Sequence, residues 1–354
     1  MKRDFLRTLT DAINPYSWIM AARNKAFDTG VLESRKFNIP TICVGNISVG
    51  GTGKTPHIEY IVGLLNKVYR IAVLSRGYGR RSKGYIKAGK ESTMEQIGDE
   101  PFQIKEKFHD IDVAVCEKRV EGIERLTHQN KSLQAILLDD AYQHRYVNAG
   151  LYILLIDSNR PLWRDCVLPF GRLRETPAGI RRADIVIFTK CKNITDEQKA
   201  AYRRYIKKKK NIPVYFSTVR YGTPYPLFKE DAATGAVIDK KSRILLVTGI
   251  AKPQPLKAEI ERYGAEVELM QYGDHHNFST TELDDIAKHF IKRGCSAIIT
   301  TEKDATRIKH RIDLPRIVRE NIYAMPIEVE FLDGEEKLFN KNIYDYVTEN
   351  SRNS

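Results

Sequence analysis

The sequence predicts an α/β protein that combines a mostly parallel sheet with a second, smaller α/β domain. Its 354 residues exceed the usual size of one domain, which favours two hydrophobic cores. Short runs of β-branched and aliphatic residues alternate with helix-like intervals along the chain. Such nearly continuous apolar runs are typical of strands that are buried on both faces of a parallel sheet and joined by crossover helices.

The elements of the first domain follow this alternation, beginning with the apolar run at Thr41. Further strands are expected where the apolar runs are short and rich in β-branched residues, at residues 70–77, 113–118, 135–140, 152–157, 184–190 and 213–218. Helices are expected between them, at residues 56–67, 101–108, 119–127 and 196–209.

A polar segment at residues 220–242, with two prolines and two glycines, predicts a linker after the first domain. The α/β alternation then resumes, with strands expected at residues 243–250, 266–273, 297–303 and 322–331. We therefore predict four parts, which are an N-terminal segment (1–36), a first domain (37–219), the linker (220–242) and a second domain (243–354).

The stretch VGNISVGGTGKTP follows the first strand and precedes a helix-like interval. Backbone N–H groups of a glycine-rich turn at a helix N-terminus bind phosphate, and the helix dipole favours the anion. A lysine in this position reaches the β and γ phosphates, and the hydroxyl after it ligates Mg²⁺. We predict a P-loop NTPase-like first domain whose nucleotide site comprises Ser48, Val49, Gly50, Gly51, Thr52, Gly53, Lys54 and Thr55.

Acidic residues lie at the boundaries of two predicted elements, the end of a strand and the start of a helix. Asp139 and Asp140 end the strand AILLDD, where a terminal carboxylate assists Mg²⁺ in P-loop enzymes. The segment GDEP places Asp99 and Glu100 before a proline at a helix start, which is also good N-terminal capping chemistry. In the second domain, GDHHNFS offers either metal ligands or a histidine that tunes a carboxylate base by hydrogen bonding.

The chain is basic, with a formal net charge of +13, and this favours an anionic partner. Arginines concentrate in SRGYGRR, at the end of a predicted strand, and in LPFGRLRETPAGIRRAD. Because arginine binds phosphate bidentately, these segments suit a phosphorylated substrate, although a solvated basic loop is the alternative. No aromatic-rich RNA motif or recognition helix supports a nucleic-acid partner, and no obligate protein partner is indicated.

The N-terminal segment has the pattern of an amphipathic helix, with Tyr16, Ile19, Met20, Phe27 and Val31 at roughly helical spacing. Aromatic and basic side chains on such a helix suit a bilayer surface, and packing on the domain is the alternative. No signal peptide and no apolar stretch long enough to span a membrane is visible. Five scattered cysteines without metal-binding spacing suit a reducing cytoplasm.

Taken together, these strings resemble the tetraacyldisaccharide 4′-kinase family. The strings that carry the resemblance occur in the family's order: VGNISVGGTGKTP, LSRGYGRR, GDEP, LLDDAYQH, PFGRLRE, RADIVIFTK, GDHHNFS and TTEKDATR. Ser48 fits as well, since the loop of this family begins with a hydroxyl residue. The sequence departs from the family at Ala141 and Tyr142, where glycine and phenylalanine are more usual.

The resemblance implies transfer of the ATP γ-phosphoryl group to the 4′-hydroxyl of a tetraacylated glucosamine disaccharide 1-phosphate. It implies a peripheral enzyme at the cytoplasmic face of the bacterial inner membrane, in contact with an anionic membrane surface. Asp99 would be the catalytic base and His275 its supporting partner. Thr55, Glu100 and Asp140 would ligate Mg²⁺. The positions implicated in substrate handling or catalysis are Arg76, Tyr78, Asp139, His144 and Arg174.

Two other enzyme classes share a phosphate loop of this type. A GTPase or a metallochaperone-like NTPase would carry [NT]KxD after a late strand, where this chain has Thr189, Lys190 and, in place of the aspartate, Lys192. The acceptor for the guanine protons is therefore missing. A small-metabolite kinase is the other alternative, which the arginine-rich segments and the N-terminal segment disfavour.

Overall fold

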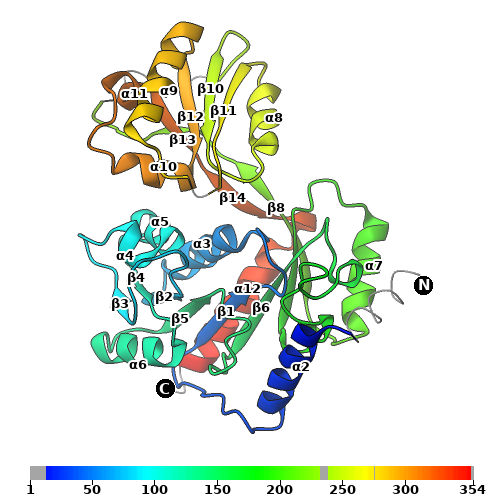
Figure 1. Cartoon of the computed structure of the whole chain (residues 1–354). Helices are drawn as coiled ribbons and strands as arrows, with labels where there is room; N and C mark the ends of the chain where they lie inside the picture. Colours follow the sequence, from blue (N-terminus) through cyan, green and yellow to red (C-terminus); the bar gives the residue numbers. More distant parts are fainter. Residues whose placement is uncertain (1–12, 232–237, 275, 352–354) are drawn as a thin grey trace. The chain divides into compact units, whose positions relative to one another are not determined.

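The computed structural model describes residues 13–231, 238–274 and 276–351 (Figure 1). The chain forms two compact units, and it passes between them twice. Unit 1 extends to Val219 and resumes at Val329, while unit 2 comprises Arg220–Glu328. Both units are built from parallel strands and covering helices, so the predicted α/β class with a smaller second part is confirmed.

Nine strands among the described residues form the sheet of unit 1: β1 (Thr41–Gly45), β2 (Ile71–Ser75), β3 (Ile86–Lys87), β4 (Asp112–Val115), β5 (Ala135–Asp139), β6 (Leu151–Asp157), β7 (Ile185–Thr189), β8 (Val214–Tyr221) and β14 (Ile327–Phe331). Their order is β14-β8-β7-β6-β1-β5-β2-β4-β3. From β8 to β4 all neighbouring strands are parallel, and β3 runs antiparallel to β4. The strand that precedes the phosphate loop, β1, is therefore central.

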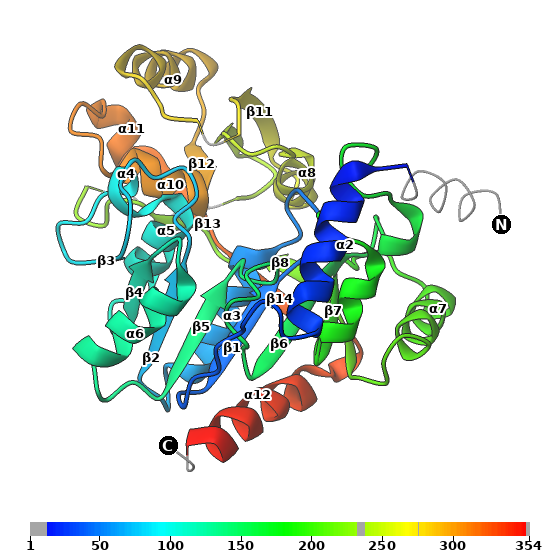
Figure 2. The same cartoon turned by 60° about the horizontal axis from the view of Figure 1, so that its bottom comes forward.

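Helices cover both faces of this sheet because its strands are apolar on both sides. One face carries α3 (Lys54–Leu65), α4 (Met94–Ile97), α5 (Asp99–Lys107) and α12 (Glu336–Ser351), and Figure 2 shows α12 lying along the sheet. The other face carries α6 (Arg119–Gln129), α7 (Asp196–Lys207) and the short 3-10 helices η1 (Leu162–Arg164) and η2 (Pro177–Arg182). A parallel sheet covered in this way presents the carboxyl ends of its strands, and the loops after them, as the place for a ligand.

Unit 2 has a five-stranded sheet in the order β11-β10-β12-β13-β9. Its strands are β9 (Tyr225–Pro226), β10 (Arg243–Thr248), β11 (Glu266–Gln271), β12 (Ala297–Thr301) and β13 (Ile322–Met325). Its helices are α8 (Gln254–Arg262), α9 (Thr280–Arg293), α10 (Glu302–Lys309) and α11 (Arg316–Asn321). The four longer strands pair in parallel, and β9, from the segment predicted as a linker, pairs antiparallel with β13.

The C-terminal boundary differs from the predicted one. The run 322–331 was expected to be one strand of a second domain that extends to residue 354. Instead, Pro326 divides it into β13 of unit 2 and β14, which joins the large sheet. Proline lacks the N–H group that a continuous ladder needs at this point. After β14 and η3 (Leu332–Gly334), α12 packs its buried side chains Phe339, Ile343 and Val347 into the core of unit 1.

The N-terminal helix α2 (Pro15–Asp28) belongs to unit 1 and contacts it through polar side chains and through Phe27, which is buried. Asn14 caps the helix and also donates to the carbonyl oxygen of Leu168 at 2.7 Å. Arg23 donates to the carbonyl oxygen of Gln143, and Asn24 to the carboxylate of Glu175 at 3.0 Å.

The opposite side of α2 exposes large apolar side chains, with Trp18 56% and Ile19 65% accessible. The five residues predicted to share one apolar face do not share it. Phe27 is buried whereas Ile19 is exposed, and Val31 lies beyond the end of the helix. Among the described residues, no helix has the length and apolar character needed to cross a bilayer.

Candidate active site

The phosphate loop connects the end of β1 to the start of α3, as predicted. Gly50 and Gly53 have φ values of 100° and 84°, a region that glycine enters without the steric cost of a side chain. Gly53 is the residue before α3, and no side chain caps that helix. The first N–H groups of a helix have no partner within it, so the start of α3 is suited to bind an anion.

Asp140 joins the phosphate loop to the arginine-rich segment. It follows β5, next to β1 in the sheet, and its carboxylate lies 3.7 Å from Lys54 Nζ and 3.1 Å from Arg174 Nη1. The backbone of Asp140 has φ of 46°, a left-handed conformation that aspartate and asparagine adopt more readily than most residues. Asp140, a predicted metal ligand, thus contacts both the lysine of the phosphate loop and a predicted substrate arginine.

The GDEP segment also reaches the phosphate loop. Thr55 Oγ1 donates to Glu100 Oε1 at 3.2 Å, so two predicted metal ligands are adjacent. Asp99 is the first residue of α5 and immediately precedes Glu100. Gly98, with φ of 89°, packs so tightly that a Cβ atom there would lie 2.9 Å from the carbonyl oxygen of Tyr78. A glycine is therefore required where the GDEP segment meets the SRGYGRR segment.

Asp139 is the most buried carboxylate of the group, with 2% of its surface exposed. Ser75, at the end of β2, donates to its Oδ2 atom at 3.1 Å, while Oδ1 is buried without a hydrogen-bond partner among the described residues. Burial, reinforced by the nearby charges of Glu100 and Asp140, raises the pKa of Asp139 to about 7. The charge of Lys54 acts in the opposite direction and lowers the pKa of Asp139. A cation placed beside Asp139 would stabilise its charged form.

This raised pKa gives a prediction for stability. An aspartate whose pKa is higher in the folded than in the unfolded chain stabilises the fold most below about pH 4 and loses that contribution as pH rises through the folded value. We expect Asp139→Asn, which cannot ionise, to gain stability relative to the wild type between pH 5 and pH 8. Urea unfolding across this range, without nucleotide or metal, measures the difference. The prediction is wrong if the free energy of unfolding changes with pH in the same way for the two proteins.

The donor set near the phosphate loop fits Mg²⁺. Thr55, Glu100 and Asp140 offer a hydroxyl and two carboxylates, the oxygen ligands that hard cations prefer. The orphaned Oδ1 atom of Asp139 adds unmatched negative charge. In the part of the chain that the structure describes, no three acidic, histidine or cysteine side chains form a metal cage. Mg²⁺ does not need such a cage, because it keeps several waters and binds through one or two carboxylates together with substrate phosphates.

A cationic group surrounds His144 on the loop after β5. The backbone N–H of Arg119 donates to His144 Nε2 at 3.3 Å, which requires an unprotonated ring nitrogen. Burial and the charges of Arg119, Arg23 and Arg76 lower the pKa of His144 to about 4. His144 is therefore neutral at pH 7 and serves as an acceptor here. Tyr78, by contrast, is 82% exposed.

Arg119 and Glu175 are buried charges at this site that the sequence analysis did not identify. The guanidinium of Arg119 donates to the carbonyl oxygens of Cys116 and Asp139. Glu175 accepts from Arg182 at 2.6 Å and from Gln143 at 3.0 Å, and Gln143 in turn lies beside Arg174. The position of Arg119 just after β4 is a signal that could have been used, because ligand sites lie at the carboxyl ends of such strands.

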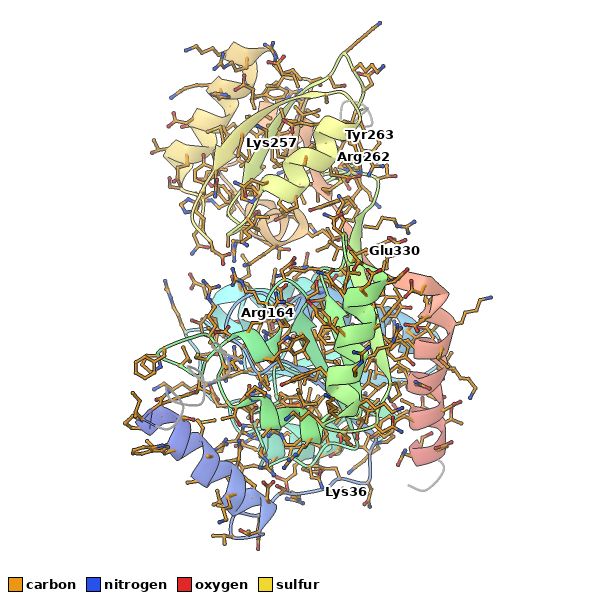
Figure 3. The ribbon with its side chains drawn as sticks, turned by 90° about the vertical axis from the view of Figure 1, so that its right-hand side faces the viewer. Lys36, Arg164, Lys257, Arg262, Tyr263 and Glu330 are labelled. Carbon is orange, nitrogen blue, oxygen red and sulfur yellow. The ribbon has the colours of Figure 1, made fainter. Side chains whose placement is uncertain are left out.

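In unit 2, the predicted base partner His275 lies outside the described residues, so its role stays a prediction. Its neighbour His276 contacts the carboxylate of Glu282 at 3.0 Å and stacks on Tyr272. Unit 2 also contains a pocket of about 480 Å³, lined in part by Tyr221, Glu259 and Tyr263. Figure 3 labels Tyr263 directly after α8. None of the predicted site residues that the structure describes lines this pocket.

Comparisons with known proteins give matches over nearly the whole chain. The family model described as tetraacyldisaccharide-1-P 4′-kinase matches residues 7–347. The chain is 47% identical to the tetraacyldisaccharide 4′-kinase of Phocaeicola vulgatus over 350 residues, covering 96% of each protein. It is 46% identical to the protein of the same name from Bacteroides fragilis over 353 residues, covering 96% of this chain and 93% of the relative.

The fold is similar to a solved structure, that of LpxK from Aquifex aeolicus in complex with ATP. The TM-score is 0.71 at 27% sequence identity, and the match covers 98% of this chain and all of the other. Together with a phosphate loop whose lysine contacts the carboxylate after β5, these matches establish the relationship. The chain belongs to the tetraacyldisaccharide-1-P 4′-kinase family.

Proposed function

We propose that this chain transfers the γ-phosphoryl group of ATP to the 4′-hydroxyl of a tetraacyl glucosamine disaccharide 1-phosphate, which forms the lipid A precursor lipid IV(A). The observation that carries the proposal is the contact of Asp140 with both Lys54 of the phosphate loop and Arg174 of the arginine-rich segment. This places a nucleotide-binding group beside a group suited to a phosphorylated substrate.

The residues divide into those that hold ATP and those that act on the acceptor. Lys54 and the N–H groups at the start of α3 bind the triphosphate. Thr55, Glu100 and Asp140 hold Mg²⁺, which when bound neutralises charge on the β and γ phosphates. Phosphoryl transfer passes through a loose transition state, so positioning and charge stabilisation account for most of the catalysis.

Asp99 is proposed to accept the proton of the 4′-hydroxyl. Two features support this role. Asp99 lies next to Glu100, whose carboxylate contacts Thr55 of the phosphate loop, and it begins a helix that follows a glycine no other residue could replace. His275 is proposed to contribute to catalysis as well, and we expect His275→Ala to lose activity while it retains its affinity for ATP.

The substrate phosphate and sugar are proposed to contact Arg76, Tyr78, Asp139, His144 and Arg174. Arg174 is suited to this role because it is partly exposed and its guanidinium already lies against a carboxylate. A substrate phosphate can therefore compete for the same donors. The Nε2 atom of the neutral His144 already accepts a hydrogen bond from the backbone N–H of Arg119. It would accept one from a sugar hydroxyl only if its contact with Arg119 broke.

We propose further that the enzyme binds peripherally to the cytoplasmic face of the inner membrane through α2. The outward side of this helix carries Trp18 and Ile19, while the loop that Asn14 holds exposes Phe170. Aromatic and aliphatic side chains on the outer side of a surface helix insert at the interfacial level of a bilayer. The net charge of +13 favours an anionic leaflet.

The membrane proposal predicts that Trp18→Ser/Ile19→Ser weakens binding to vesicles containing anionic phospholipid by about tenfold or more, because each side chain contributes roughly 1–3 kcal/mol on burial. Co-sedimentation with vesicles measures this. The matched control is Val68→Ser/Ile291→Ser, which removes two equally exposed apolar residues elsewhere. Turnover of detergent-dispersed substrate should not change. Equal losses of vesicle binding in the two double variants would contradict the proposal.

The reaction itself is tested by incubating the full chain with ATP labelled at the γ-phosphate and a tetraacyl disaccharide 1-phosphate in detergent. The expected product is a labelled lipid with phosphate monoesters at positions 1 and 4′. Labelling of a small sugar or nucleoside instead would favour a small-metabolite kinase. Equal use of GTP, or hydrolysis without any labelled lipid, would favour the GTPase or metallochaperone-like alternative.

A further inference from the structure

Three consecutive carbonyl oxygens of the phosphate loop each accept a hydrogen bond from a side chain. The donors are Lys190 Nζ to the oxygen of Gly51, Thr189 Oγ1 to the oxygen of Thr52 at 2.9 Å, and His57 Nδ1 to the oxygen of Gly53 at 2.7 Å. We call these three donors the carbonyl clamp. Thr189 and Lys190 occupy the first two positions of the incomplete guanine-recognition motif, and the proposed function leaves them without a role.

Each donor of the clamp is itself held in place. Lys190 Nζ pairs with Asp157, the last residue of β6, at 2.8 Å. Its backbone has φ of 60°, a left-handed conformation that is unfavourable for a lysine and turns the side chain back from the end of β7. Thr189 is buried, so its hydroxyl has few alternative partners.

His57 is buried at 3% exposure and makes two hydrogen bonds. Since the carbonyl oxygen of Gly53 only accepts, Nδ1 must carry the proton and Nε2 must accept from Ser217 Oγ, 3.0 Å away. Burial lowers the pKa of His57 to about 4, so this neutral tautomer persists at pH 7. The clamp therefore links the loop to β7, through Thr189 and Lys190, and to β8, through Ser217.

The clamp fixes the direction of the loop amides. In a planar trans peptide, the carbonyl of one residue and the N–H of the next point in opposite directions. Holding the oxygens of Gly51, Thr52 and Gly53 therefore aims the N–H groups of Thr52, Gly53 and Lys54 away from the clamp. These N–H groups surround the uncapped start of α3, where an anion binds.

The strand order separates the clamp donors Thr189 and Lys190, and Ser217, which contacts His57, from the acidic groups. On one side of β1 lie β6 and β7, which supply Asp157, Thr189 and Lys190. On the other side lies β5, which is followed by Asp140, and beyond it β2. Among the residues that the structure describes, no hydrogen bond or ion pair joins a clamp donor to the carboxylates of Asp139, Asp140 or Glu100.

We propose that Lys190, Thr189 and His57 are positioning residues that preorganise the phosphate loop for the ATP triphosphate and thereby set nucleotide affinity. The proposal rests on the proposed function to the extent that the nucleotide is ATP. Preorganised donors increase affinity because the loop does not have to be ordered when the ligand binds. Since the clamp lies apart from the acidic groups, its loss affects nucleotide binding and leaves the chemical step almost unchanged.

The test compares Thr189→Val, which removes the hydroxyl at constant shape, with Thr189→Ser, which keeps it. Lys190→Met removes the ammonium and keeps the stem, and Lys208→Met, at an exposed lysine after α7, is its control. Calorimetric titration with ATP and Mg²⁺ gives the Kd without any lipid. We expect Thr189→Val, which loses a buried hydrogen bond, and Lys190→Met, which loses an exposed one made by a charged donor, to raise the Kd about 3- to 30-fold.

At saturating ATP, kcat should remain within about twofold of the wild type, and the KM for the lipid should not change. Thr189→Ser and Lys208→Met should bind ATP normally. The proposal is wrong if kcat falls while the Kd for ATP is unchanged, or if Thr189→Ser weakens binding as much as Thr189→Val. Because the Kd is measured without an acceptor, wild-type protein that binds ATP and phosphorylates no lipid would refute the proposed function and leave the clamp comparison valid. Circular dichroism verifies that each variant is folded.

Discussion

Asp99→Asn lowers kcat by about 10²–10⁴-fold, the usual contribution of a general base, and leaves the Kd for ATP unchanged. The proposed role of Asp99 is to accept the proton of the acceptor hydroxyl and not to hold the nucleotide; Asp99 starts α5 beside Glu100, which contacts Thr55 of the phosphate loop. Asparagine has the same shape and cannot accept the proton. Lipid phosphorylation at saturating ATP, together with calorimetric ATP titration, measures both quantities.

The control for Asp99→Asn is Glu95→Gln, which removes an exposed carboxylate from the neighbouring helix α4. This variant should retain normal turnover. A near-normal kcat for Asp99→Asn would rule out the base role. Loss of ATP affinity in parallel with turnover would instead assign Asp99 to the nucleotide or metal.

Asp140→Asn is expected to lower kcat by about 10²–10³-fold, the effect of removing one preorganised charged group from a catalytic site. The carboxylate of Asp140 contacts Lys54 and Arg174 and is a proposed Mg²⁺ ligand, so the variant loses three interactions at once. Asparagine is the informative replacement because it tolerates the left-handed backbone at this position, whereas alanine would add strain.

A titration with Mg²⁺ distinguishes metal binding from the other contacts of Asp140. The variant should need a higher Mg²⁺ concentration for half-maximal activity, because one carboxylate ligand is missing. Asp184→Asn provides the control, since Asp184 precedes β7 at the opposite end of the same sheet. An unchanged Mg²⁺ requirement with reduced turnover would assign Asp140 to Lys54 and Arg174 rather than to the metal.

The sequence predicted the phosphate loop and the acids after β5 because each is a local pattern. A strand, a glycine-rich turn and a helix follow one another from Thr41 to Leu65, and the apolar run from Ala135 ends directly in its carboxylates. The parallel sheet then brings the ends of these strands together. Local order along the chain was therefore sufficient to find Lys54 and Asp140.

Features that depend on distant packing were not predicted. Helix α12 joins unit 1 because Phe339 and Ile343 complete a core that is formed by residues about 300 positions earlier, as the pairing of Tyr346 with Thr41 also shows. Pro326 was a visible signal that the last strand is interrupted, and it should have been used.

The orientation of α2 was also beyond sequence analysis. Helical spacing identifies the residues that share a side, but not which side packs on the protein. Here Arg23 and Asn24 face inward because loop carbonyl and carboxylate groups of Gln143 and Glu175 accept their hydrogen bonds. Arg119 was missed because nothing in its local pattern shows that the guanidinium turns inward to the carbonyl oxygens of Cys116 and Asp139.

The most direct test of this account is hydrogen–deuterium exchange of the full chain with a non-hydrolysable ATP analogue and Mg²⁺, under conditions where calorimetry shows binding. The account predicts slower exchange in the amides of residues 49–57, and loss of this protection in Lys54→Met. Unchanged exchange in the phosphate loop of the wild type while the analogue is bound would contradict it, because the nucleotide would then bind elsewhere.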